Sequence, residues 1–151
     1  MPKFTHDEIK GRVADGSIFA ITVDTSIFDK YGCNLDFVIL RKLDQFRKSN
    51  VRVLLSAVVS NEVVVHIARD AAETRRELKS ALKKHAKRWK LTGEQGTAAG
   101  SLFSENEPIG VAERQLADFL DAVGAELISA AGSVEVSRRG VTALFRRGAP
   151  I

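Results

Sequence analysis

The stretch SIFAITVDTS, residues 17–26, indicates the class of fold. Its first seven residues form a short, nearly continuous apolar run rich in β-branched side chains. Such a run is typical of a strand that is covered on both faces in a parallel sheet. The run ends abruptly at Asp24, which the small hydroxyl residues Thr25 and Ser26 follow. Because ligands bind at the carboxyl ends of the strands in open parallel sheets, Asp24 occupies a position suited to a functional carboxylate.

Outward from this stretch, the hydrophobic pattern predicts alternating helices and strands. Helices are expected over residues 35–46, 57–89, 108–123 and 133–147, and strands over residues 51–55 and 126–129. Asn34 is the expected N-cap of the first of these helices, Pro108 opens the third and Gly124 stops it. This order predicts an α/β fold, a parallel sheet flanked by helices in a PIN-like three-layer α/β/α arrangement, incomplete at the C-terminus.

The length of 151 residues suits one domain with its own core, residues 1–151. The predicted helix over residues 57–89 would be roughly 50 Å long, so we expect it to bend, to break or to overhang the core. Residues 92–107 contain three glycines and no hydrophobic periodicity, which predicts a mobile surface loop.

Composition limits the cellular compartments and the kinds of binding partner that we expect for this protein. The net charge of +4 suits a partner that carries phosphates, although many other proteins are equally basic. Cys33 is the single cysteine, so no internal disulfide can form, as expected in a reducing compartment. The most apolar stretch, residues 53–68, is interrupted by polar side chains, and the N-terminus has no apolar core. We therefore expect a cytoplasmic protein with no membrane span.

Glu62 is the second carboxylate of interest, because it interrupts a run of apolar residues early in the helix that follows the second strand. A charge beside so much apolar surface is costly unless a cation or donor compensates it. Glu62 and Asp24 would meet at the carboxyl edge of the sheet, and oxygen ligands select Mg²⁺ or Mn²⁺ rather than zinc. The structural alternatives are that Asp24 caps a turn and that Glu62 lies in a first helical turn favoured by the macrodipole.

Two segments resemble the motifs of PIN-like nuclease domains. Residues 21–28 (ITVDTSIF) are similar to the opening motif, and residues 53–63 (VLLSAVVSNEV) to the second, in which a strand leads through Ser or Thr into a helix with an early Glu. The resemblance covers about residues 18–66. It implies that Asp24 and Glu62 are catalytic, metal-holding acids, two of the three or four acids with which the family binds Mg²⁺ or Mn²⁺ and cuts RNA. It also implies that Thr25 and Ser26 support the site.

The later acids of the family have no match at the expected places. Asp118 and Asp121 lie within a predicted helix, and Glu126 begins a strand rather than ending it. Three explanations remain open: the chain is an N-terminal fragment, a protein partner completes the fold, or catalysis is lost. We favour the fragment, and expect a metal-dependent ribonuclease in the complete protein but a weak or inactive chain alone. The alternative is a non-catalytic PIN-like binding or scaffold module.

A basic run with an aromatic residue inside it could follow an RNA backbone. The candidate contacts are Lys83, Lys84, Lys87 and Arg88, beside Trp89. The alternative is a solvated face near a helix C-terminus. A second basic cluster comprises Arg138, Arg139, Arg146 and Arg147.

His66 shares a helix face with Glu62, which would allow a role in binding metal or substrate. The pair lacks the second histidine of a zinc protease, so packing at the helix surface is the favoured interpretation. Cys33 has no activating partner in the sequence, which predicts an inert thiol.

Overall fold

The computed structural model describes residues 4–103, 106–129 and 134–135, and its strands form one sheet in the order β1-β2-β3-β4. The strands are β1 (Ala20–Thr22), β2 (Arg52–Ser56), β3 (Glu126–Ile128) and β4 (Val134–Glu135). β1 pairs with β2, and β2 with β3, in parallel, whereas β4 is antiparallel to β3. The predicted α/β class with a parallel sheet flanked by helices is confirmed.

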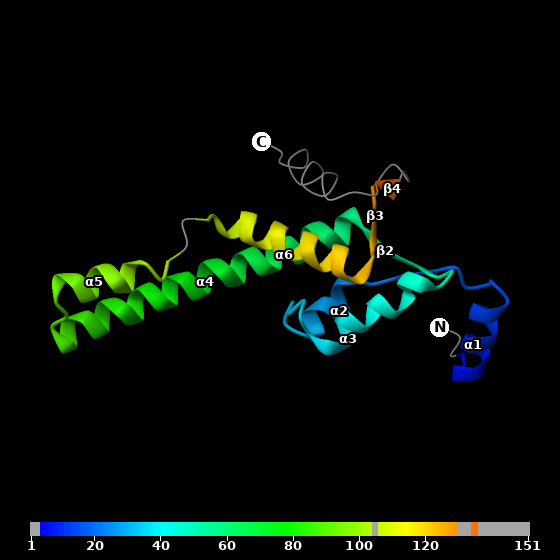
Figure 1. Cartoon of the computed structure of the whole chain (residues 1–151), viewed down its shortest axis with the longest axis horizontal. Coiled ribbons are helices and arrows are strands. Elements are labelled where there is room, and N and C mark those ends of the chain that lie inside the picture. Colours follow the sequence, from blue (N-terminus) through cyan, green and yellow to red (C-terminus); the bar gives the residue numbers. More distant parts are fainter. Residues whose placement is uncertain (1–3, 104–105, 130–133, 136–151) are drawn as a thin grey trace.

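Helices provide most of the remaining structure (Figure 1). They are α1 (His6–Ala14), α2 (Thr25–Lys30), α3 (Val38–Arg41), the 3₁₀ helix η1 (Lys42–Lys48), α4 (Ala57–Trp89), α5 (Gly93–Gly100) and α6 (Pro108–Val123). Figure 1 shows α4 extending far beyond the sheet, with α6 alongside its inner part. In the part of the chain that is described, no helix is both long and apolar enough to cross a bilayer.

The core lies between one face of the sheet and the helices α2, α3, α4 and α6. Leu55 of β2 and Leu127 of β3 are register partners and are both buried in this core. On the opposite face, Arg52 of β2 forms an ion pair with Glu126 of β3, and both side chains are partly exposed. Within the described residues, the buried core and this ion pair therefore lie on opposite faces of the sheet.

α4 begins and ends where the sequence predicts. The Ser56 side chain accepts a hydrogen bond of 3.2 Å from the amide of Val59, which satisfies an otherwise unpaired donor at the helix start. Lys90 ends the helix in the left-handed conformation, with φ of 47°. The helix is continuous over 33 residues, so of the three expectations for this long element the overhang is the one observed.

The helix predicted over residues 35–46 is wrong in its details. The Asn34 side chain accepts a bond of 3.1 Å from the amide of Asp36 in a local turn, and Phe37 is the N-cap of the short α3 instead. The chain then continues as the 3₁₀ helix η1, which has three residues per turn. Leu40 is consequently buried, while Val38 of the predicted inner face is 65% exposed.

The irregular loop predicted over residues 92–107 is also wrong for its first half, where α5 forms. Thr92 accepts from the amide of Gln95, and the Gln95 side chain accepts from the amide of Thr92, which is a capping box. The Thr-x-x-Gln spacing of this box is present in the sequence at residues 92–95. Helix initiation therefore outweighs the local cost of Gly93, Gly96 and Gly100.

The last predicted helix, residues 133–147, is contradicted at its start by β4, which pairs with β3 through Ile128 and Val134. Residues 136–147 lie outside the described residues, and so does the basic cluster of Arg138, Arg139, Arg146 and Arg147.

Candidate metal centre and nucleic-acid interface

Asp24 follows β1 and occupies the N-cap position of α2, yet its side chain makes no capping hydrogen bond. Its Oδ2 instead accepts a bond of 2.7 Å from the hydroxyl of Ser26. This bond lowers the pKa of Asp24 below its ordinary value, and the backbone amides of Thr25 and Ser26 contribute in the same direction. Asp24 is thus an exposed, charged carboxylate at the start of α2.

Glu62 lies in the second turn of α4, because α4 begins at Ala57 and has no acidic residue in its first turn. The helix macrodipole acts mainly within the first turn, so it does not explain this carboxylate. Glu62 is also exposed, unlike Val63 and Val64 beside it. Because the Glu62 side chain is exposed, it does not incur the free-energy cost of burial that the surrounding apolar sequence suggested.

The hydroxyl of Thr25 connects the two sequence motifs, since it donates a hydrogen bond to Oε2 of Glu62. Thr25 directly follows Asp24 and begins α2, so the start of α2 and the second turn of α4 meet at this bond. Ser26 donates to Asp24 in the same short segment. The two hydroxyl residues thus support one carboxylate each.

The donor set at this edge fits a hard divalent cation. Mg²⁺ retains several waters and is commonly bound through one or two carboxylates together with substrate phosphates. Asp24 and Glu62 supply exposed carboxylate oxygens of this kind, and a metal bound to them would provide Lewis-acid activation of water or phosphate. Within the described ranges, neither acid belongs to a group of three or more close metal-ligating side chains.

A different cluster lies one helical turn away and was not predicted. Nδ1 of His66 on α4 lies 2.7 Å from Oδ1 of Asp29 on α2, and the Cys33 thiol donates to the same oxygen over 3.6 Å. Burial, followed by the adjacent Asp29, raises the pKa of the Cys33 thiol to about 11. The four-residue spacings of Asp29 from Thr25 and of His66 from Glu62 are visible in the sequence, but the contact between α2 and α4 is not.

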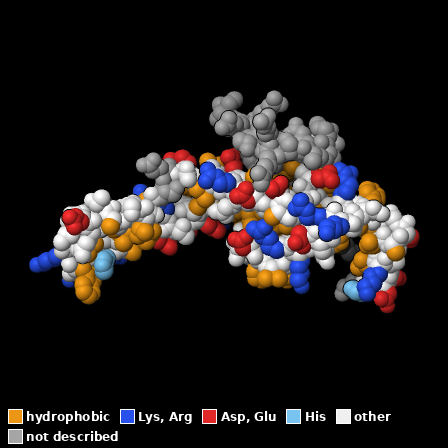
Figure 2. Space-filling view, in the orientation of Figure 1, with side chains coloured by type: hydrophobic (Ala, Val, Ile, Leu, Met, Phe, Trp, Pro, Cys, Tyr) orange, Lys and Arg blue, Asp and Glu red, His pale blue; other side chains and the backbone are white. Residues whose placement is uncertain are grey.

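The candidate RNA contacts Lys83, Lys84, Lys87 and Arg88 are all exposed on the outer part of α4. At 1.5 Å per residue, the 21 residues from Glu62 to Lys83 span roughly 32 Å. Trp89 is 72% exposed, and its ring stacks on His85 with centroids 5.7 Å apart. In Figure 2, hydrophobic and histidine side chains adjoin at the end of the molecule farthest from the sheet, where Lys and Arg also occur.

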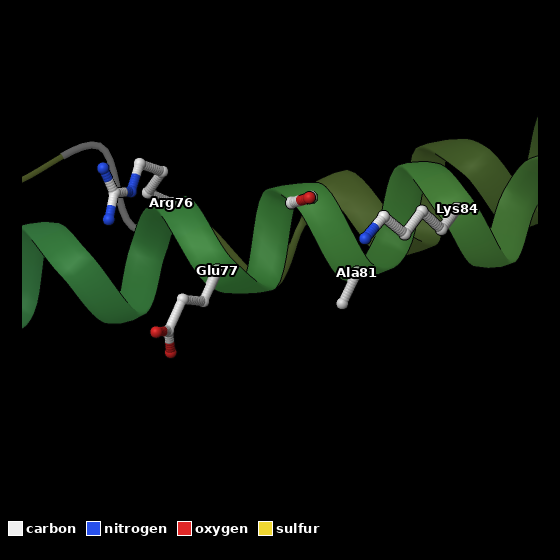
Figure 3. A pocket seen from close by; sticks show the side chains of 5 residues that line it. Arg76, Glu77, Ala81 and Lys84 are labelled. Carbon is white, nitrogen blue, oxygen red and sulfur yellow. The ribbon is translucent and has the colours of Figure 1, made fainter.

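Two hollows on the described surface are lined by neither Asp24 nor Glu62. One is lined by Arg76, Glu77, Ser80, Ala81 and Lys84, which all belong to α4. Figure 3 shows their side chains spread along the outside of this one helix rather than between two elements. Such a surface is open, and it does not enclose a ligand as a catalytic pocket would.

Comparison with protein families matches residues 21–151 to the PIN domain. The matched range extends well beyond residue 66, where the resemblance visible in the sequence ends. PIN domains are typically metal-dependent nucleases and commonly bind RNA. Comparisons with curated proteins and with solved structures gave no match. Because the matched range covers most of the chain, the protein belongs to the PIN domain family.

Proposed function

We propose that this protein is a PIN-type ribonuclease domain that depends on Mg²⁺ or Mn²⁺, with Asp24 and Glu62 as its metal-holding acids. The observation that carries the proposal is the hydrogen bond from Thr25 to Glu62, which joins the segment of Asp24 to the acid on α4. Two exposed carboxylates, each supported by a neighbouring hydroxyl, form an arrangement that accepts a cation without displacing buried groups.

In this proposal the side chains of the chain have separate tasks. Asp24 stays ionised because the Ser26 hydroxyl and nearby amides favour its charge, so it is available to a cation at neutral pH. Thr25 fixes one oxygen of the exposed Glu62 carboxylate, and the other oxygen would be available to a cation. Groups that orient a ligand in this way are commonly worth a factor of about 10 to 100 in metal affinity or activity.

The outer part of α4 would hold RNA away from the scissile bond. Lys83, Lys84, Lys87 and Arg88 supply positive charge, and the exposed Trp89 offers a face on which a base can stack. The separation of roughly 32 Å along the helix means that one nucleotide cannot contact both Glu62 and Lys83. We expect the protein to act in the cytoplasm, where a reduced Cys33 thiol persists.

The second candidate function is a non-catalytic PIN-like binding or scaffold module. It is favoured by the limited charge of the carboxylate site, since Asp24 and Glu62 have no third close ligand within the described residues. Two carboxylates hold Mg²⁺ weakly, because that ion loses its waters reluctantly and needs a well-shaped site. For the same reason we expect RNA cleavage by the isolated chain to be slow.

Thermal melting and cleavage assays together separate these two functions. The wild type, Glu62→Gln and the exposed control Asp44→Asn are melted with EDTA and with millimolar Mn²⁺, and incubated with single-stranded RNA. The proposal expects Mn²⁺ to stabilise the wild type and the control but not Glu62→Gln. It also expects Asp24→Asn to abolish whatever Mn²⁺-dependent cleavage is measured. If the wild type and Glu62→Gln melt alike in both buffers, the carboxylates are not a working metal site and the binding module is favoured.

A further inference from the structure

The cluster of Asp29, Cys33 and His66 brings together three different metal-ligating groups. One ligand atom from each residue lies within 4.8 Å of the other two. Oδ1 of Asp29 is at the centre, 2.7 Å from Nδ1 of His66 and 3.6 Å from Sγ of Cys33. Asp29 is exposed and His66 partly exposed, while Cys33 is buried, so the cluster opens to solvent on one side only.

The backbone holds these residues in place from two elements. Asp29 lies on α2 one turn after Thr25, and His66 lies on α4 one turn after Glu62. Cys33 follows α2 in the left-handed region, with φ of 52°, and its amide donates a bond of 2.9 Å to the carbonyl of Phe28. A non-glycine residue in this region is uncommon, and such conformations concentrate at functional sites.

The order of contacts argues against a nucleophilic cysteine. In a catalytic triad the imidazole lies between the nucleophile and the carboxylate, so that it can accept the proton. Here the carboxylate of Asp29 lies between the thiol of Cys33 and the imidazole of His66. A carboxylate in contact with the thiol disfavours the thiolate, so this arrangement does not activate Cys33.

Two of the three distances between ligand atoms can be compared with those that a tetrahedral zinc ion requires, and the third lies within 4.8 Å. With Zn–S near 2.3 Å and Zn–O near 2.1 Å, the sulfur and oxygen ligands of one ion lie about 3.6 Å apart. The observed distance between Cys33 Sγ and Asp29 Oδ1 is 3.6 Å. The nitrogen and oxygen ligands should lie about 3.3 Å apart, so the observed 2.7 Å between His66 and Asp29 must open slightly. A small side-chain rotation of the exposed Asp29 achieves this.

We propose that Asp29, Cys33 and His66 form a binding site for a zinc-type divalent transition metal ion, distinct from the carboxylate pair of Asp24 and Glu62. Sulfur and imidazole ligands favour Zn²⁺ over Mg²⁺, whereas oxygen ligands alone have the opposite preference. Binding replaces the thiol proton of Cys33, which leaves to water, by a sulfur–metal bond. Three protein ligands leave a fourth position for water.

Such an ion would link Asp29 on α2 and Cys33, which follows α2, to His66 on α4. These are the two helices that carry Thr25 and Glu62, which meet one turn away. Occupancy would therefore fix the helix pair that positions the carboxylate site. The inference does not depend on whether that site cuts RNA.

Cobalt provides a direct test, because Co²⁺ bound to a thiolate shows an intense sulfur-to-metal charge-transfer absorption. The full chain is titrated with Co²⁺ and then with Zn²⁺, and Zn²⁺ affinity is measured by calorimetry. We expect one equivalent of Co²⁺ to give the absorption, Zn²⁺ to displace it, and millimolar Mg²⁺ to leave it unchanged. The same titration in Glu62→Gln should match the wild type, because the carboxylate pair is not part of this site.

Two substitutions remove ligands separately. Cys33→Ser should abolish the charge-transfer absorption, and His66→Gln should lower Zn²⁺ affinity by on the order of 100-fold. His66 is partly exposed, so its variant keeps the test valid if Cys33→Ser does not fold, as judged by circular dichroism. The proposal is overturned if the wild type shows no absorption. It is equally overturned if Zn²⁺ affinity is unchanged in His66→Gln or is lost in Glu62→Gln.

Discussion

The inner part of α4, residues 57–72, and its outer part, residues 73–89, belong to one continuous helix but have different surroundings. The buried residues of α4 all lie in the inner part, namely Ser60, Val63, Val64 and Ile67. In the outer part, Leu78 is 40% exposed and Trp89 is 72% exposed. The inner part is therefore stabilised by packing against the core, and the outer part by local helical interactions.

This difference corresponds to two kinds of task. Metal-binding side chains must keep defined positions, and the proposed ligands Glu62 and His66 both lie on the packed inner part, where residues of α2 contact them. Phosphate contacts tolerate variation in geometry, and the candidate basic contacts lie on the outer part. A few contacts still support the outer part, such as that of the Lys79 ammonium with the ring of Phe103 at 5.5 Å.

The largest effect is expected from removing core packing on the two parts of α4. Ile67→Ala should lower the free energy of unfolding by about 2–5 kcal/mol, because its buried side chain leaves a cavity. Leu78→Ala, as the matched change on the outer part, should alter it by no more than about 0.5 kcal/mol. Denaturant unfolding of both variants measures the difference. Equal losses would show that the outer part is packed as tightly as the inner part.

A smaller effect is expected from the hydroxyl that connects α2 to α4. Thr25→Val keeps the side-chain shape but removes the donor to Glu62, so Mn²⁺ affinity should fall by about 10- to 100-fold. Calorimetric titration with Mn²⁺ measures this change. Thr74→Val is the control, since Thr74 donates only to the carbonyl of Ala71 within α4. Unchanged affinity in Thr25→Val would exclude a positioning role for this hydroxyl.

Removing charge from the outer part should weaken RNA binding without affecting the fold. Replacing Lys87 and Arg88 together by Ala should reduce affinity for single-stranded RNA on the order of tenfold, and should reduce the salt slope by about 1.4 if each contacts one phosphate. Fluorescence anisotropy at several salt concentrations measures both. The control replaces Lys42 and Lys48 on η1, which changes the net charge equally. An identical loss in the control would indicate attraction by net charge alone.

The smallest effect is the loss of stability expected when one partner of an ion pair is neutralised, and it should depend on pH. The Arg52 guanidinium lowers the pKa of Glu126 by hydrogen bonding, so this pair stabilises the fold above the ordinary pKa of Glu and loses its effect as pH falls through the lowered value. Glu126→Gln should cost up to about 1 kcal/mol at pH 7. Its difference from the wild type should disappear in acid.

The pair of Glu73 and Arg76 on outer α4 provides the comparison for this last prediction. It lies within one helix at 3.6 Å, so Glu73→Gln should cost only about 0.2–0.5 kcal/mol. Urea melts of both variants from pH 7 to pH 3 measure the two costs. If the two variants lose equal stability, pairing across the sheet has no advantage over pairing along a helix.

Local patterns in the sequence predicted several features correctly. The apolar run before Asp24 predicted β1, and Ser56 marked the start of α4, because strand propensity and capping depend on neighbouring residues alone. The 3₁₀ geometry of η1 and the burial of Leu40 rather than Val38 in α3 were not predictable in this way, since both depend on contacts with distant elements. The capping box of α5 lies within four consecutive residues, although the glycines of this segment favoured the prediction of a loop.

The candidate metal sites likewise combine features that the sequence determined with features that only the tertiary structure decided. The sequence by itself determined that Asp24 and Glu62 follow two successive strands, because the positions of strands and helix starts are encoded in consecutive residues. Only the tertiary structure decided that Thr25 bonds to Glu62 and that Asp29 meets His66, each pair being 37 residues apart in the chain. The physical reason is that packing of α2 against α4 sets their relative rotation. That rotation arises from the shared core around Phe28 and Val63, whose contacts no local pattern specifies.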